Sequence, residues 1–438
     1  MDKPAFLGGT PVQVGHRKWP IVTDDDKRAV MRVLDRGILS GSFAPETRAL
    51  EEEFAAFVGA KYALLTHCGT SALQLTVAAA GASEGDEVIV PAYSFVATPL
   101  SVALQGATPV FVDVDPETGH MDPALAEAAI TPRTKAIMPV HIHGEAADMT
   151  ALLELGRKKK LAILEDAAQA QGAEHQGRRV GALGASGGFS LQSSKNLTAG
   201  EGGLFVTNDE GAAELANQVR NFGQDLHLSD AAHFDPERSL DGHRSLESLG
   251  MGSMYRGNEM AAAFARSQLR RLPELTAACQ KNGARLARKL GELPGVHAPR
   301  SLPGRTTVNH KYRVRLDPKQ AGLDVAPKVL RDAIKAALVA EGCEVVFWQS
   351  APLPAQQVFR THAHSTLRSL PGGTNLDENY DPARYGRTSA LLAGSIVLFS
   401  HTCSLIAQSE ATVDRYAEAF ARVWHYRQAI VERHTSGQ

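Results

Sequence analysis

Short apolar runs alternate with helix-like segments from about residue 61 to residue 207, and this alternation constrains the fold more than any other feature. The apolar runs are rich in Val, Ile and Leu and lack a regular in/out alternation, which is typical of strands buried on both faces of a sheet. They occupy residues 62–65, 87–90, 110–114, 136–140 and 161–164. Amphipathic segments such as 148–160 lie between them. The sequence therefore predicts an α/β fold with a mostly parallel central sheet covered by helices.

The pattern changes after Asp209. Residues 221–250 are polar and predict a long loop, and residues 259–287 predict a long helix interrupted near Pro273. The remaining chain mixes strand-like and helical segments; they are 311–316, 344–348 and 395–400, and 325–340 and 410–431. With 438 residues the chain exceeds one ordinary domain. We predict a large α/β domain over residues 1–270, including the N-terminal segment, and a smaller C-terminal α+β domain over residues 271–438.

Composition narrows the partners and the compartment. A formal net charge of -2 gives no electrostatic reason to expect nucleic acid or an anionic membrane surface. No run approaches eighteen apolar residues, and the first fifteen residues do not resemble a signal peptide. The four Cys lie far apart without a CxxC pair, and the sixteen His show no metal-ligand spacing. These features predict a cytoplasmic protein without a metal site.

The segment 187–208, GGFSLQSSKNLTAGEGGLFVTN, surrounds Lys195 with small polar residues between two strand-like runs. A lysine held in such a turn is poorly placed for ordinary solvation. Burial lowers the pKa of an amine and makes its neutral form available as a nucleophile for a carbonyl. A surface lysine in a glycine-rich loop explains the spacing equally well.

A carboxylate pair ends the apolar run 161–164, in LAILEDAAQAQG. Ligands of parallel α/β sheets bind beyond the carboxyl ends of the strands, so Asp166 lies where a ligand would bind. A buried carboxylate is costly without a partner, and a protonated heterocyclic nitrogen would be a suitable one. The alternative, an Asp that caps the next helix, is about as plausible for this segment alone.

Three further segments follow predicted strands. HCGTSAL, residues 67–73, places Gly69 and Thr70 where a helix begins, and helix N-termini bind phosphate, although ordinary capping looks the same. PAYSFVAT, residues 91–98, places Phe95 where an aromatic ring can stack on a flat cofactor or simply join the core. His141, in PVHIHG, is a candidate proton relay or substrate contact, although a lone His is more often structural.

Taken in order, these segments resemble the DegT/StrS-type family of sugar and cyclitol aminotransferases. The resemblance spans about residues 19–420. Its most specific part is the motif FS-four residues-K-x-LT-x-GEGG around Lys195, with Ser190 at its start. It implies a fold-type-I architecture that depends on pyridoxal 5'-phosphate (PLP), nearer to the keto-cyclitol and aminohydroxybenzoate-synthase-like members.

The resemblance also implies residue roles. Lys195 looks like the lysine that binds the cofactor aldehyde and moves protons, and Asp166 like the partner of its ring nitrogen. Gln169 looks like the contact to the phenolic oxygen. Phe95 matches the stacking position and His141 the PVHxxG strand end. The phosphate cradle would be formed by Gly69, Thr70 and Ser190.

One stretch departs from the family pattern. The family often has N-Y-R-[LM]-x-E, through which the second subunit reaches the cofactor phosphate. Here Met254 stands at the Asn position, and Arg256 is retained as a candidate cofactor contact.

The resemblance implies transfer of an amino group from Glu or Gln to a keto-cyclitol or keto-sugar, in antibiotic or other secondary-metabolite biosynthesis, by a homodimer with shared active sites. A subgroup with His in place of the lysine performs dehydration, and Lys195 favours transamination. Two alternatives remain open. One is a dehydrating or aromatising enzyme related to aminohydroxybenzoate synthase. The other is a non-catalytic regulatory protein of the same fold.

Overall fold

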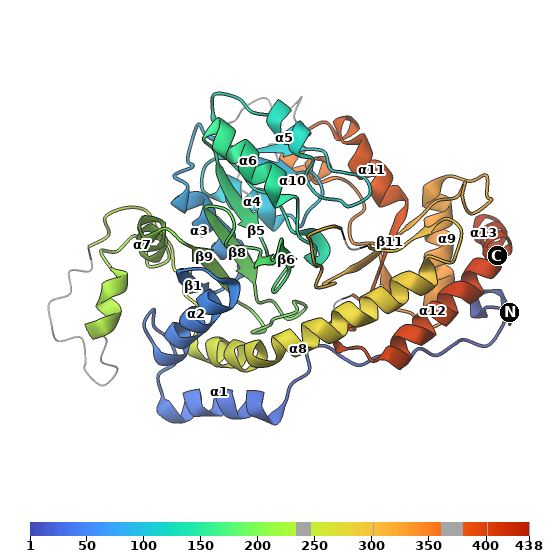
Figure 1. Cartoon of the computed structure of the whole chain (residues 1–438), viewed down its shortest axis with the longest axis horizontal. Coiled ribbons are helices and arrows are strands. Elements are labelled where there is room, and N and C mark those ends of the chain that lie inside the picture. The colour runs from blue at the N-terminus through green and yellow to red at the C-terminus, as the bar shows by residue number, and fades with distance from the viewer. Residues whose placement is uncertain (234–246, 301, 361–379, 401, 438) are drawn as a thin grey trace.

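The computed structural model describes residues 1–233, 247–300, 302–360, 380–400 and 402–437. A central sheet with helices on both sides forms one part of the molecule, and a smaller sheet with its own helices forms the other (Figure 1). The long helix α8, Glu259–Leu290, runs beneath both parts (Figure 1). The predicted α/β fold with a smaller α+β domain is confirmed.

The central sheet has seven strands in the order β1-β9-β8-β5-β4-β2-β3. All pairs are parallel except those of β9, which runs antiparallel to both β1 and β8. The strand bounds are Tyr62–Thr66 (β1), Glu87–Pro91 (β2), Thr108–Val112 (β3), Thr134–Ile137 (β4), Ala162–Asp166 (β5), Ser186–Ser190 (β8) and Gly203–Thr207 (β9). Burial on both faces explains why the apolar runs are continuous. The predicted runs match five of these strands within three residues at either end.

Helices connect the parallel strands and cover the sheet. They are α3 (Gly69–Ala79), α4 (Ala97–Leu104), α5 (Pro123–Ala128), α6 (Met149–Lys159) and α7 (Glu210–Val219), with α1 (Asp24–Arg36) and α2 (Pro45–Val58) packed on α8. Short connections bring the residues after β1, β4, β5 and β8 to the carboxyl-end edge of the sheet. The candidate residues of the sequence lie at that edge.

The smaller domain is built on a four-stranded antiparallel sheet in the order β10-β11-β13-β12. Its strands are Val296–His297 (β10), Tyr312–Leu316 (β11), Val345–Val346 (β12) and Ser395–Leu398 (β13). Its helices are α9 (Pro327–Ala340), α11 (Gly386–Ala393), α12 (Glu410–His425) and α13 (Arg427–Thr435). The short helix α10 (Gln357–Arg360) packs on the large domain instead, where Phe359 contacts Phe111 of β3. The single helix predicted over residues 410–431 is thus two helices, because the chain leaves helical geometry at Tyr426.

Helix α8 differs from its prediction because it continues through Pro273. Proline removes one intrahelical hydrogen bond, but Leu269, Leu272 and Thr276 pack into the core on either side of it. Packing of the apolar face outweighs the lost bond. The predicted domain boundary at residue 270 falls inside this helix and stays a prediction.

The N-terminal segment was predicted with the large domain, but it lies against the smaller one. The Ala5 N–H and the Val12 N–H donate to the two carboxylate oxygens of Glu341, at 2.7 and 2.9 Å. Arg422 of α12 donates to the Thr10 carbonyl. Backbone groups at the start of the chain therefore find partners that the small domain supplies.

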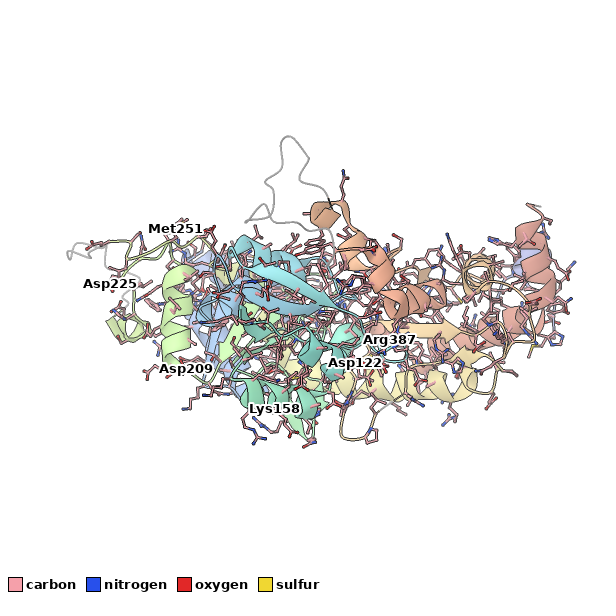
Figure 2. The ribbon with its side chains drawn as sticks, turned by 90° about the horizontal axis from the view of Figure 1, so that it is seen from above. Asp122, Lys158, Asp209, Asp225, Met251 and Arg387 are labelled. Carbon is pink, nitrogen blue, oxygen red and sulfur yellow. The ribbon has the colours of Figure 1, made fainter. Side chains whose placement is uncertain are left out.

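Surface ion pairs join the two domains as well. Arg387 at the start of α11 contacts Asp122, which caps α5, at 2.8 Å, and the two lie side by side in Figure 2. Of the predicted loop 221–250, residues 234–246 lie outside the described residues, and its described part contains a short 3-10 helix, Leu228–His233. Among the described residues, no helix is long and apolar enough to cross a membrane.

Candidate active site

Asp166 is the last residue of β5 and its side chain is buried. The Thr98 hydroxyl donates to Oδ2 at 2.6 Å and the Ala168 N–H donates to Oδ1 at 3.1 Å. Burial raises the pKa of Asp166, while these hydrogen bonds and the charge of Lys195 oppose the rise. A carboxylate with neutral hydrogen-bond donors and a desolvated environment favours a cationic partner.

Lys195 lies in the loop between β8 and β9. The Trp19 indole N–H donates to its carbonyl at 3.0 Å, and the side chain of the adjacent Asn196 donates to the Val308 carbonyl at 2.8 Å. Burial lowers the pKa of Lys195 to about 8, and the charge of Asp166 opposes that shift. The amine and the carboxylate are thus electrostatic neighbours, and a substantial share of the amine is neutral near physiological pH.

A tight approach between α3 and β8 brings together Gly69 and Ser190, two of the residues predicted to bind a phosphate. A Cβ atom on Gly69 would lie 2.6 Å from the Cβ atom of Ser190, so only glycine fits. Helix α3 begins at Gly69, and its N-cap residue Cys68 provides no side-chain hydrogen bond. Thr70 follows as the second helical residue. The backbone N–H groups of this first turn are therefore available to an anion, which the helix dipole also favours.

Gln169 is oriented by the backbone near His143. The His143 N–H donates to Gln169 Oε1 at 3.0 Å, which leaves the amide nitrogen as the donor end. His143 itself has φ 58°, and its Nε2 lies 2.7 Å from the Tyr93 hydroxyl. The orientation of Gln169 suits a contact to a phenolic oxygen.

His141 was predicted as a proton relay or substrate contact, and its hydrogen bonds contradict that role. The ring is fully buried, and Nδ1 accepts the Ala147 N–H at 3.0 Å. The other nitrogen, Nε2, lies 3.0 Å from Glu165 Oε2. With both nitrogens bound to protein groups, His141 cannot pass protons to a substrate. The main-chain N–H of His141 donates to the Asp166 carbonyl. His141 therefore positions the end of the strand beside Asp166 instead.

Phe95 and Arg256 lie at the edges of the site. Phe95 precedes α4 and is 60% exposed, so one ring face is available to a ligand or a second subunit. Arg256 forms an isolated β-bridge with Thr66, at the end of the strand that leads into α3, and its side chain reaches Asn221 Oδ1 at 3.4 Å. Met254 is 47% exposed. The stacking role of Phe95 and the cross-subunit role of Arg256 stay predictions.

The residues present fit PLP on chemical grounds. A desolvated carboxylate, a lysine with a lowered pKa, an uncapped helix start with a glycine that a Cβ would block, and an oriented amide donor meet at one sheet edge. These groups match the ring nitrogen, aldehyde, phosphate and phenolic oxygen of that cofactor.

Comparison with known proteins agrees with this arrangement. The model of the DegT/DnrJ/EryC1/StrS aminotransferase family matches residues 20–379. The chain belongs to the DegT/DnrJ/EryC1/StrS aminotransferase family. Dependence on PLP is implied by the family. The solved structure of an aminotransferase from Psychrobacter cryohalolentis superposes with a TM-score of 0.80 at 28% identity, covering 94% of this chain and all of that one.

Two curated relatives of the family cover almost the whole chain. The L-glutamine:scyllo-inosose aminotransferase of Streptomyces griseus is 36% identical and covers 97% of this chain and 98% of its own. The L-glutamine:2-deoxy-scyllo-inosose aminotransferase of Streptomyces kanamyceticus is 35% identical, with the same coverage of 97% and 98%. The crystal structure of 3-amino-5-hydroxybenzoic acid synthase superposes with a TM-score of 0.77 at 31% identity, covering 94% of this chain and all of that one.

Sequence reasoning missed several residues around the site. Thr98 binds Asp166, and Trp348, from beyond β12, packs edge-on against Tyr93 and His143 with ring centroids 5.1 and 4.8 Å apart. Thr98 lies in the segment 91–98, four residues after Ser94. Its partner Asp166 lies 68 residues further along the chain. The Trp348 contact crosses between domains, so local sequence carried no signal for it.

Proposed function

We propose that this aminotransferase binds PLP at Lys195 and moves the amino group of L-glutamine to a ketone on a carbocycle, a keto-cyclitol. The observation that carries the proposal is the electrostatic coupling of Lys195, a half-buried lysine with a lowered pKa, to the buried carboxylate of Asp166 at the sheet edge. The names of the two Streptomyces relatives support the donor and the acceptor class. Those names also favour a place in antibiotic biosynthesis, and a cytoplasmic location follows from the sequence expectations.

When bound, PLP supplies an electron sink that stabilises negative charge at the carbon next to the transferred nitrogen. Asp166 keeps the proton on the ring nitrogen, and Gln169 donates to the phenolic oxygen. The start of α3, with Thr70 and Ser190, binds the phosphate. Lys195 would hold the cofactor through its aldehyde.

The Lys195 amine would take the proton from the donor α-carbon and return a proton to the acceptor carbon. An amine whose pKa is about 8 suits both directions, because its protonated and neutral forms are close in free energy near that pH. The burial that lowers the pKa also excludes water from the reacting atoms.

The test uses PLP-loaded protein with L-glutamine and no acceptor. One equivalent of the keto acid of glutamine should form per site. The absorbance of the cofactor at the violet end of the visible spectrum should decrease. Addition of scyllo-inosose should restore the absorbance and yield the amino-cyclitol. Lys195→Ala should do neither, and a variant that turns over normally would refute the assignment.

The same experiment separates the alternatives. Solved structures with this fold include 3-amino-5-hydroxybenzoic acid synthase, so a dehydrating or aromatising reaction is the second candidate. It predicts loss of water from the acceptor without keto acid from the donor. A non-catalytic regulatory protein predicts cofactor binding without keto acid from any amino donor.

A homodimer with shared active sites completes the proposal. Several apolar side chains near the cofactor edge of the large domain are exposed in the single chain, including Phe95, Phe222 and Met254. A second copy packed on this surface would bury them and bring its own side chains to the phosphate.

A further inference from the structure

A cavity of about 580 Å³ lies between the two domains, next to the candidate cofactor site. The large domain contributes Glu117, His143 and Glu145 to its wall, and the smaller domain contributes one side of β11. The cavity is separate from the cofactor contacts named above, but His143 belongs to its wall and also orients Gln169.

The β11 wall is cationic because of the strand period. Tyr312, Val314 and Leu316 are buried in the core, whereas Arg313 and Arg315 face the cavity together with Lys311, the residue before the strand. Alternate residues of a strand point to the same face, so the sequence KYRVRL places three cations on one wall.

Lys311 is a buried cation of this wall, and the charge of Glu344 is the opposite charge that acts on it. Its side chain is buried, with 4% of the residue exposed, and Nζ has no hydrogen-bond partner among the described residues. Arg313, by contrast, donates to Ser395 Oγ and to the Glu117 carbonyl. An unpaired buried ammonium group is costly, and a bound anion would offset that cost.

Two opposing polar atoms on the cavity wall are also unpaired. Glu145 Oε1 and His143 Nδ1 are buried and lack hydrogen-bond partners within the described part of the chain. Native structures rarely leave several buried polar atoms of one wall unsatisfied, so the set points to a ligand with acceptor groups at one end and donor groups at the other.

The position of Lys311 connects the cavity to the chemistry. Its charge is one of the causes that lower the pKa of Lys195, so the two amines lie within electrostatic range of each other. Lys195 in turn acts on His143 in the same way. A ligand that binds Lys311 would therefore lie within electrostatic range of Lys195, the residue proposed to move the α-carbon proton.

We propose that Lys311 binds the α-carboxylate of the amino donor and that Glu145 accepts a hydrogen bond from the side-chain amide of L-glutamine. The inference rests on the proposed function for the identity of the donor. An ammonium–carboxylate contact is among the strong hydrogen bonds of proteins. Burial raises the pKa of Glu145 to about 7. Above that pH its carboxylate attracts an amide N–H and repels the side-chain carboxylate of L-glutamate, which gives selectivity by a repulsive element.

Binding without reaction gives the first test. The probe is 4-carbamoylbutanoate, which is glutamine without its amino group, added to PLP-loaded protein in a calorimeter. Lys311→Met should weaken its binding at least about tenfold, as expected for loss of a charged hydrogen bond, while Lys311→Arg should retain most of it. Arg315→Met is the matched control, since Arg315 lies four residues and ~13 Å along the same face. Equal binding in wild type and Lys311→Met would overturn the assignment.

The donor half-reaction gives the second test. In Lys311→Met, the L-glutamine concentration for half-maximal keto-acid formation should rise at least about tenfold, while wild type and variant should react equally with 4-aminobutanamide, which lacks the carboxylate. Equal losses with both donors would mean that Lys311 supports the fold or the cofactor, and would overturn the proposal.

Glu145→Gln tests the other end of the cavity. Its preference for L-glutamine over L-glutamate, as the ratio of kcat/KM values, should fall about tenfold. An unchanged ratio would remove Glu145 from the proposal. Wild-type protein that binds 4-carbamoylbutanoate through Lys311 but forms no keto acid would refute the proposed function and leave the carboxylate site standing.

Discussion

At the scale of single residues, the site depends on groups held in protonation states that water would not favour. Burial raises the pKa of Asp166 and lowers that of Lys195, and each charge opposes the shift of the other. The protonation state of each residue therefore depends on the charge of the other. The proposed cofactor, with a cationic ring nitrogen and an aldehyde that consumes an amine, would satisfy both residues at once.

The pH dependence of cofactor capture follows from Lys195. Burial lowers its pKa from the usual 10.5 to about 8, so the reactive neutral amine is a minority below pH 8 and a majority above it. The rate at which cofactor-free protein captures PLP should therefore rise about tenfold per pH unit below 8 and level off above it.

Stopped-flow absorbance measures that rate. Lys311→Met should move the midpoint to higher pH, because it removes a like charge that lowers the pKa of Lys195. A flat profile between pH 6 and 9 would contradict the assignment of Lys195 as the capturing amine.

Gly69→Ala tests the phosphate cradle. The new Cβ would lie 2.6 Å from Ser190 Cβ and 3.0 Å from its Cα, which forces α3 and β8 apart where the phosphate should bind. PLP affinity should fall at least about tenfold, measured by equilibrium dialysis. Gly386→Ala is the control, because a Cβ there meets nothing within 4 Å, and equal affinity losses in the two variants would contradict the cradle.

At the scale of elements, α8 organises the packing of the N-terminal helices. Glu259, its first residue, is fully buried and accepts the Glu46 and Thr47 N–H groups at 2.9 and 2.7 Å and the Thr47 hydroxyl at 2.8 Å. Arg36 of α1 contacts the same carboxylate at 2.9 Å. One side chain thereby holds the start of α2, the end of α1 and the start of α8 together.

Glu259→Gln should lower the free energy of unfolding by about 1.5–3 kcal/mol, because the amide cannot accept on its nitrogen and loses the charged contacts. Chemical denaturation of cofactor-free protein measures this. Glu410, on α12, is exposed and pairs with Lys281. Glu410→Gln should change the free energy of unfolding by less than about 1 kcal/mol. If the two variants lose the same stability, the Glu259 contacts contribute no more than a surface pair.

The local sequence predicted the helices and strands whose hydrophobic pattern matches the burial of their residues. The strands of the central sheet follow from continuous apolar runs, and Asp166 and Lys195 follow from polar residues placed where such runs end. The sequence could not predict that α8 continues through Pro273 or that the Glu145–Lys311 cavity exists. Those features depend on packing between segments far apart in the chain, and such packing overrides local propensity.

At the scale of the whole molecule, the exposed apolar residues bear on assembly. Met251 is 98% exposed and Met254 47%, and Met251 lies at the end of the molecule away from α13 (Figure 2). The double variant Met251→Asp with Met254→Asp should shift the mass measured by light scattering from dimer toward monomer, and it should also weaken PLP binding. Val339→Asp, at an exposed Val on α9, is the control. A wild-type monomer with full cofactor affinity would contradict the shared site.

The indole of Trp19 has a consequence for how this enzyme would lose its cofactor. Its ring N–H holds the Lys195 carbonyl, while its main-chain N–H donates to the Thr402 carbonyl of the other domain. A hinge motion that moves the C-terminal sheet away from the large domain would therefore displace the loop that carries Lys195. On gradual heating, the absorbance of bound PLP should therefore decrease when the two domains separate, before the helices unfold.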